Sequence, residues 1–272
     1  MPPSRPTLAV SSGPLWRLQT PHAFEVIKAS GAEGVEIMVN QSTDTQSPNT
    51  LEQLANRHDL PIVAIHAPQL LLTRNVFSSN QLEKVRRTVE LAKALGAQTI
   101  VLHPPYAWHV RYSLWVLHEL EDIAQDSPTV TMENMYPVHV GKRRLRFHRF
   151  GGLESLDRYT HVTLDTSHLA VAEADIVDAY RALADRVVHI HLSDNRGKGR
   201  DSHAPLGQGM LPIDEFGRAL DGPALRSIAL EIEPGPRAEE PGYIESVFGT
   251  SLDVVRANLP TSTSGSADRA PR

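Results

Sequence analysis

Short runs rich in apolar and β-branched residues recur along the chain, and stretches with the apolar spacing of amphipathic helices lie between them. These runs predict eight strands, at residues 7–12, 34–39, 62–66, 99–103, 129–133, 162–165, 187–192 and 228–232. Residues 81–95 are apolar at helical spacing, and Gly96 follows where a helix C-terminus is expected. Residues 172–183 form a second stretch of this kind.

Strands that alternate with helices imply right-handed crossovers and a parallel sheet. Eight such units, at intervals of about 30 residues, close most naturally into a barrel. We therefore expect an α/β protein with a single (β/α)8 TIM barrel over residues 1–259 and its active site at the C-terminal ends of the strands. Residues 260–272 are rich in small polar residues and are expected to form a disordered polar tail.

Composition narrows the classes of protein further. The 272 residues are 40% hydrophobic and 22% charged, which suits a globular core and excludes a disordered chain. The net charge of −5 argues against nucleic-acid binding through global charge, although a local basic strip remains open. The absence of cysteine excludes disulfides and thiolate metal sites. No leader pattern or long apolar run is present, so we expect a soluble, cytoplasmic protein and no membrane contact. The pattern does not indicate an oligomeric state.

Two long connections follow predicted strands and should lie on the active face of the barrel. Residues 135–152 contain the basic run 142–149, and residues 195–211 contain several glycines and basic residues. Two interpretations stay open for the basic side chains: they bind phosphate groups, or they form an ordinary solvated charge run. The side chains concerned are Lys142, Arg143, Arg144, Arg146 and Arg200.

Histidines and acidic residues gather at or just after the predicted strand ends. They are His66, His103, Glu133, Asp165, His168, His191, Asp201, His203 and Glu231. A lone histidine in a strand is more often a core residue than a ligand, but parallel strand ends converge on one mouth. Several carboxylates at one mouth repel each other unless cations compensate them. Imidazole and carboxylate ligands suit divalent zinc, manganese or iron, so we predict a metal centre.

Over residues 62–233 the chain resembles the xylose isomerase-like TIM barrel superfamily, and within it the endonuclease IV family. Residues 203–209, His-Ala-Pro-Leu-Gly-Gln-Gly, are similar to a glycine-containing signature of that family. The resemblance implies up to three zinc ions held by nine ligands. Their counterparts are His66, His103 and Glu133 for the first ion, Glu133, Asp165, His191 and Glu231 for the second, and His168, Asp201 and His203 for the third.

Charge counting agrees with this assignment. The four carboxylates of the set contribute −4 against +6 from three divalent ions, which leaves about +2 for an anionic substrate and a hydroxide. Such a site lowers the pKa of bound water to roughly 7 and stabilises attacking and departing oxygens at phosphorus. We therefore expect a trinuclear phosphoester hydrolase of the endonuclease IV type, in which a metal-bound hydroxide attacks phosphorus.

Departures from the endonuclease pattern argue against DNA as the substrate. Gln69 stands where that family places an aromatic residue that probes the duplex, and Ser42 replaces an expected basic residue. The segment 34–36, Gly-Val-Glu, is instead typical of sugar isomerases and epimerases. We expect a small phosphorylated or sugar-like substrate, with nucleic acid not favoured. Its predicted contacts are Glu36, which has pairing with an arginine as its alternative, Gln69, Arg143 and Arg200.

The rival interpretation is a sugar or sugar-phosphate isomerase or epimerase with one divalent ion. Three carboxylates against one such ion leave about −1, which suits a neutral sugar better than a phosphate. Glu133 and Glu231 would then exchange the proton next to a carbonyl as general base and acid. These two glutamates are the predicted catalytic residues in either scheme. His189, two residues before His191, is expected deeper in the barrel and in a supporting role. A barrel without catalysis is a third, less favoured class.

Overall fold

The computed structural model describes residues 5–124, 128–140 and 143–260. Eight parallel strands close into a barrel, which confirms the predicted fold, and their order around it is β1-β10-β9-β8-β5-β4-β3-β2. The bounds are β1 Thr7–Ser11, β2 Gly34–Met38, β3 Ile62–His66, β4 Thr99–Leu102, β5 Thr129–Glu133, β8 Val162–Asp165, β9 Val187–Leu192 and β10 Ser227–Leu230. Each differs from its prediction by two residues or fewer at either end. Lys142 and most of the predicted tail, residues 261–272, lie outside the described residues.

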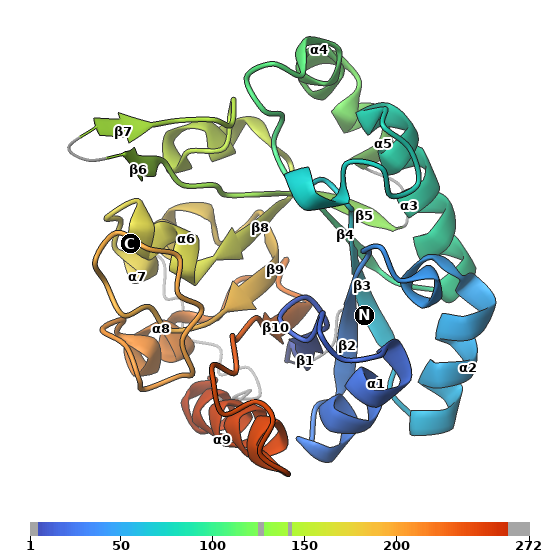
Figure 1. Ribbon diagram of the computed structural model, residues 1–272. Coiled ribbons are helices and arrows are strands. Elements are labelled where there is room, and N and C mark those ends of the chain that lie inside the picture. Colours follow the sequence, from blue (N-terminus) through green and yellow to red (C-terminus); the bar gives the residue numbers. More distant parts are fainter. Residues whose placement is uncertain (1–4, 125–127, 141–142, 261–272) are drawn as a thin grey trace, which may run out of the picture.

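Helices surround the barrel (Figure 1). Their bounds are α1 Thr20–Ala29, α2 Pro48–His58, α3 Gln81–Leu95, α4 Val110–His118, α5 Leu120–Ala124, α6 Thr166–Val171, α7 Ile176–Leu183, α8 Ile213–Ala219 and α9 Tyr243–Asn258. Helix α3 ends at Gly96, which has the left-handed φ of 67° that suits glycine. Among the described helices, none combines the length and the apolar character that a membrane crossing requires.

The predicted helix over 172–183 is shorter in the structure, because the chain breaks just before it. Helix α6 ends at Val171, and Glu173 takes a left-handed φ of 61°. Helix α7 begins only after Asp175, whose carboxylate accepts hydrogen bonds from the N–H groups of Val177 and Asp178, both at 2.9 Å.

A hairpin that the sequence pattern did not indicate lies in the long connection after β5. Strands β6 Val138–Val140 and β7 Arg143–Leu145 pair antiparallel and project to one side of the barrel (Figure 1). All three residues of β7 are exposed, so no alternation of apolar and polar positions marks the strand.

The barrel interior is polar near the mouth, and strand alternation explains why. Glu36, His189 and His191 point inward and contact one another, and all three have no exposed surface. Their chain neighbours Val35 and Ile190 point the other way and belong to the apolar core. The chain thus places ionisable groups inside the barrel and its apolar side chains between strands and helices.

Candidate metal centre

The predicted ligands lie together at the C-terminal ends of the strands. His66, Glu133 and Asp165 are the last residues of β3, β5 and β8. Strand pairing also places Asp165 directly opposite His191 of β9. Residues up to 165 positions apart in the chain therefore share one site, as the convergence of parallel strand ends requires.

Glu133 occupies the centre of the cluster. Its Oε2 atom lies 2.9 Å from Nε2 of His103 and 3.3 Å from Nε2 of His66. Its Oε1 atom lies 3.0 Å from Nδ1 of His191. One oxygen of this carboxylate thus faces the histidines of β3 and of the end of β4, and the other oxygen faces the histidine of β9. This is the arrangement of a bridging ligand.

A second group forms around His191. Its Nδ1 atom lies 3.0 Å from Oε2 of Glu231 and 3.9 Å from Oδ2 of Asp165. Glu133, Asp165, His191 and Glu231 each offer a ligand atom, and these atoms lie within 4.8 Å of one another. The same limit holds for His66, Glu133 and His191. The two groups therefore share Glu133 and His191.

A third group lies on the side of the long loop after β9. Oδ2 of Asp201 lies 3.3 Å from Nε2 of His168 and 3.1 Å from Nε2 of His203. Asp165, His168 and His203 also offer ligand atoms within 4.8 Å of one another. Asp165 consequently belongs to two groups, and the nine predicted ligands form one continuous cluster.

Three of the histidines are oriented by a hydrogen bond from Nδ1 to a backbone carbonyl. Nδ1 of His66 donates to the carbonyl of Ala67 at 3.1 Å, and Nδ1 of His168 donates to the carbonyl of Asn134 at 2.8 Å. Nδ1 of His203 donates to the carbonyl of Glu231 at 2.9 Å. A carbonyl only accepts, so Nδ1 carries the proton and Nε2 faces the cluster with its lone pair whenever the ring is neutral. Such fixed tautomers are characteristic of metal-ligating histidines.

Glu36, predicted as a substrate contact, has no exposed surface and lies beneath His191 in the barrel interior. Its Oε2 atom is 2.9 Å from Nε2 of His191 and 2.8 Å from Nε2 of His189, and Oε1 accepts a hydrogen bond from Ser11 at 2.7 Å. Burial raises the pKa of Glu36, but His191 and His189 outweigh it and hold the pKa well below the usual value. Its partners are histidines rather than the arginine considered as an alternative. His189 is in the supporting position predicted for it.

Gln69 is also buried, and it fixes the end of β4. Its Oε1 atom accepts from the backbone N–H of His103 at 2.7 Å, and its Nε2 atom donates to the hydroxyl of Tyr112 at 2.7 Å. That hydroxyl donates in turn to the carbonyl of His103 at 3.1 Å. The other two predicted substrate contacts, Arg143 on β7 and Arg200 in the loop after β9, are exposed and lie in none of the ligand groups.

The crowded carboxylates of the cluster shift the pKa values of the histidines beside them. Burial lowers the pKa of His203, but Asp165 and the hydrogen bond to Asp201 outweigh it and raise the pKa to about 10. The pKa of His191 is raised well above the usual value because Glu36, Glu231 and Glu133 overcome its burial. Burial raises the pKa of Asp165 to about 6. Protonated histidines thus compensate the carboxylates where no cation is bound.

One orphaned atom tests whether a metal fits. Oδ2 of Asp165 is buried and has no hydrogen-bond partner in the part of the chain that the structure describes. It lies 3.9 Å from Nδ1 of His191 and 3.8 Å from Nδ1 of His168. Buried polar atoms in native proteins nearly always have a partner, so a missing ion is a direct explanation. The donors are imidazole nitrogens and carboxylate oxygens, which suit zinc, manganese or iron. The residues therefore fit a divalent metal centre.

Sequence reasoning missed two residues that contact the predicted ligands. Asn134 accepts from the backbone N–H of Asp165 at 2.6 Å and donates to its carbonyl at 3.1 Å. Ser167 donates to Oδ1 of Asp201 at 2.6 Å. Asn134 directly follows the ligand Glu133, and Ser167 directly precedes the ligand His168. That adjacency was the available signal.

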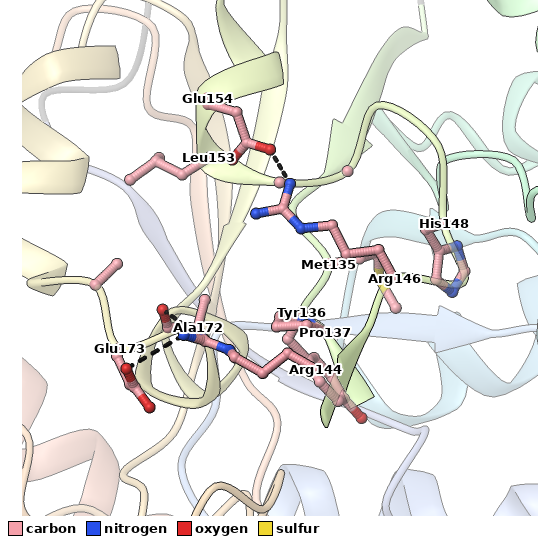
Figure 2. A pocket seen from close by; sticks show the side chains of 13 residues that line it. Met135, Tyr136, Pro137, Arg144, Arg146, His148, Leu153, Glu154, Ala172 and Glu173 are labelled. Carbon is pink, nitrogen blue, oxygen red and sulfur yellow. Dashed lines mark hydrogen bonds and ion pairs between the residues drawn. The ribbon is translucent and has the colours of Figure 1, made fainter. Parts of the chain in front are cut away.

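A pocket of about 360 Å³ lies beside the cluster. Figure 2 shows Arg146 reaching Glu154, and Arg144 reaching Glu173 and the carbonyl of Ala172. The pocket is therefore lined by both signs of charge, and these two arginines of the basic run are paired with carboxylates.

Two aromatic side chains of the pocket lining also border the cluster. The ring of Tyr136 lies 4.7 Å from that of His168, and the ring of His148 lies 6.2 Å from that of His103. The pocket and the ligands therefore share a wall.

Comparisons with known proteins give one family model and several similar proteins. A family model described as "Xylose isomerase-like TIM barrel" matches residues 24–248. An uncharacterized protein of Mycobacterium tuberculosis, Rv0498, is 32% identical, and the alignment covers 94% of this chain and 99% of that protein. A probable endonuclease 4 of Solibacter usitatus is 29% identical over 73% of this chain and 80% of its own length. The crystal structure of a D-tagatose 3-epimerase-like protein superposes with a TM-score of 0.68 at 22% identity, over 92% of this chain and 98% of that chain.

Proposed function

Because the chain belongs to the xylose isomerase-like TIM barrel family, we propose that it is a metal-dependent phosphoester hydrolase with up to three divalent ions, zinc before manganese or iron. The observation that carries this proposal is the position of five residues that a single ion would not need. They are His66, His103, His168, Asp201 and His203, and all contact the four-residue group around His191 or one another. The similarity to a probable endonuclease 4 supports the same conclusion.

Each part of the site has a task in this reaction. Bound divalent ions supply Lewis acidity to phosphoryl oxygens and lower the pKa of water. Glu133 holds two ligand groups at a fixed separation, since its two oxygens face different histidines. His66, His168 and His203 present Nε2 in a fixed orientation because their Nδ1 atoms are bound to carbonyls. The chain's own contribution is thus a preorganised site.

The pocket beside the cluster suggests the kind of substrate. Arg144 and Arg146 face Glu173 and Glu154, so a second phosphate placed there would meet carboxylates as well as guanidinium groups. A neutral polar group can use both kinds of partner. We therefore propose a small phosphoester whose phosphate lies at the cluster and whose uncharged part lies in the pocket, with Arg143 and Arg200 as contacts further out.

DNA is not favoured as the substrate. Gln69 occupies the position where the endonuclease family places its duplex-probing aromatic residue, and here its side chain lies buried against His103 and Tyr112. Arg144 and Arg146 of the basic run are also paired with carboxylates, which weakens the attraction of these two side chains for a polyanion.

One observation favours the alternative of an isomerase or epimerase. Glu133, Asp165, His191 and Glu231 form a complete four-ligand group for one ion without the other five residues. Glu133 and Glu231 would then act as base and acid on a hydroxy-ketone. The D-tagatose 3-epimerase-like structure shares the fold that such a reaction uses.

Metal content and substrate class together test the proposal. The full chain is loaded with zinc, dialysed and analysed for ions per chain, then assayed with aryl phosphate mono- and diesters and with ketohexoses. About three ions and phosphoester hydrolysis support the hydrolase, whereas about one ion and ketose epimerisation support the alternative. A chain that retains no ion overturns both.

A further inference from the structure

Asp194 lies at the base of the loop that carries Asp201 and His203. It follows β9 closely, and its backbone N–H and C=O pair with those of Ala204, both at 2.8 Å, which closes the loop between them. Its side chain is only 1% exposed. A carboxylate buried to this extent is unfavourable unless it is hydrogen-bonded, so its partners show what it does.

Those partners are four backbone amides. Oδ1 accepts from the N–H groups of Asn195 at 2.7 Å and Leu211 at 3.0 Å. Oδ2 accepts from the N–H groups of Gly207 at 3.1 Å and Gly209 at 2.8 Å. The donors come from both ends of the loop, and charge-assisted hydrogen bonds of this kind are stronger than neutral ones. One side chain therefore sets how the two ends of the loop approach each other.

The loop is tied to a ligand through a short chain of hydrogen bonds. Nδ2 of Asn195 donates to the hydroxyl of Ser167 and to the carbonyl of Arg200, both at 2.9 Å. Ser167 donates to Oδ1 of Asp201 at 2.6 Å, so the other oxygen of Asp201 faces His168 and His203.

The loop also holds His203 in an uncommon backbone conformation, with φ of 35°. A non-glycine residue in this region is strained and persists only when its surroundings hold it. The carbonyl of His203 accepts from the N–H of Glu233 at 2.8 Å. The shape of the loop, and not local preference, thus places this ligand.

Gly209 is the matching adaptation on the other end of the loop. A Cβ atom at this position would overlap the carboxylate of Asp194 and the carbonyl of Asn195. Glycine is therefore needed at 209 for close approach to Asp194, and an alanine there would push the carboxylate away from its amides.

We infer that Asp194 is a positioning residue that shapes residues 195–211 so that Asp201 and His203 complete the group for the third ion. This inference rests on the proposed trinuclear site. Asp194 itself bonds backbone amides and not the cluster, so its effect should fall on the third ion and spare the other two.

A zinc titration of the full chain, resolved into a dissociation constant for each ion, tests this role. Asp194→Asn replaces one acceptor oxygen with an NH2 group that would face backbone N–H groups. Gly209→Ala keeps the carboxylate of Asp194 but displaces it. This variant therefore tests the positioning role if Asp194→Asn does not fold. We expect the third ion to bind about 10- to 100-fold more weakly in both variants, with the first two ions unchanged. A purely structural role would weaken all three ions together.

Asp175→Asn is the matched control, because it also removes a carboxylate that accepts two backbone N–H groups, at the start of α7. It should leave the third ion unchanged. A third-ion affinity equal to wild type in Asp194→Asn and Gly209→Ala overturns the positioning role and leaves the hydrolase proposal intact. A wild-type chain that binds fewer than three ions overturns both.

Discussion

Nε2 of His191 lies 2.9 Å from Oε2 of Glu36, and this contact leaves Nδ1 as the nitrogen that faces Glu133 and Glu231, each at 3.0 Å. The same oxygen of Glu36 lies 2.8 Å from Nε2 of His189, whose Nδ1 lies 2.7 Å from the hydroxyl of Ser227. A buried carboxylate beneath the cluster therefore fixes the orientation of a predicted ligand, His191, without touching the mouth.

Glu36→Gln should weaken the ion at the His191 group by about 10- to 100-fold, because an amide cannot accept from both histidines through one charged oxygen. Cobalt titration followed by visible absorption measures the affinity and reports the ligand geometry. Glu33→Gln is the control: Glu33 bonds Arg5 on the surface at 2.8 Å. An unchanged cobalt spectrum and affinity in Glu36→Gln would contradict the orienting role.

Removing single histidines should remove single ions. His66→Ala takes away one partner of Glu133, and His203→Ala takes away one partner of Asp201. We expect each variant to lose about one ion per chain and most phosphoester hydrolysis. Elemental analysis checks the metal content, with the exposed His118→Ala as control. Full metal content and turnover in both variants would refute the trinuclear assignment.

Zinc binding should release protons near pH 7. The pKa of His203 is raised to about 10, and that of His168 is also raised because Asp165 and Asp201 outweigh its burial. These histidines carry protons in the metal-free chain and must lose them to become ligands, so affinity should fall as the pH falls. Calorimetry in buffers of different ionisation enthalpy measures the release. A zinc affinity that is flat between pH 6 and 8 would contradict this account of the site.

Lys84 should make stability depend on pH in the alkaline range. It is buried, its Nζ donates to the carbonyls of Pro68 and Thr73 at 2.5 Å, and burial lowers its pKa from 10.5 to about 8. Below pH 8 both the folded and unfolded chains hold the proton. Between pH 8 and 10.5 only the unfolded chain still holds it, so the free energy of unfolding should rise across this window, by up to about 3 kcal/mol.

Denaturant unfolding of the metal-free chain at pH 8 and pH 10.5 measures this rise. The rise should be smaller in Lys84→Met than in wild type, and Lys93→Met, on the exposed side of the same helix, should behave as wild type. An equal rise in the free energy of unfolding in wild type and Lys84→Met would show that Lys84 does not titrate in this window.

Arg146 should affect substrate binding rather than the chemical step. It lines the pocket and pairs with Glu154, outside the ligand groups. We expect Arg146→Ala to raise KM about 3- to 10-fold with kcat unchanged, because the lost contact is present in both ground and transition states. Steady-state kinetics with a phosphoester substrate checks this, and Arg86→Ala, on the exposed side of α3, is the control. A fall in kcat with KM unchanged would place Arg146 in the reaction itself.

The barrel and the convergence of the predicted ligands at one mouth were predictable because each depends on local pattern. Alternation of apolar runs and amphipathic stretches marks strands and helices, and parallel strands bring their carboxyl ends to one mouth. His66, Glu133 and Asp165 could thus be assigned to one site from their places at strand ends. The hairpin of β6 and β7 escaped prediction because each strand has three residues and those of β7, Arg-Arg-Leu, are all exposed and do not alternate.

Only the tertiary structure decided the direction in which each side chain points. Glu36 and His191 are 155 residues apart, and only barrel closure shows that Glu36 lies under the ligand and not at the mouth. Gln69 turns inward to His103, Arg144 meets Glu173, and three of the four amides around Asp194 come from 13 to 17 residues further along the chain. Such contacts depend on distances of a few ångströms between separate segments, and periodicity along the chain carries no information about those distances.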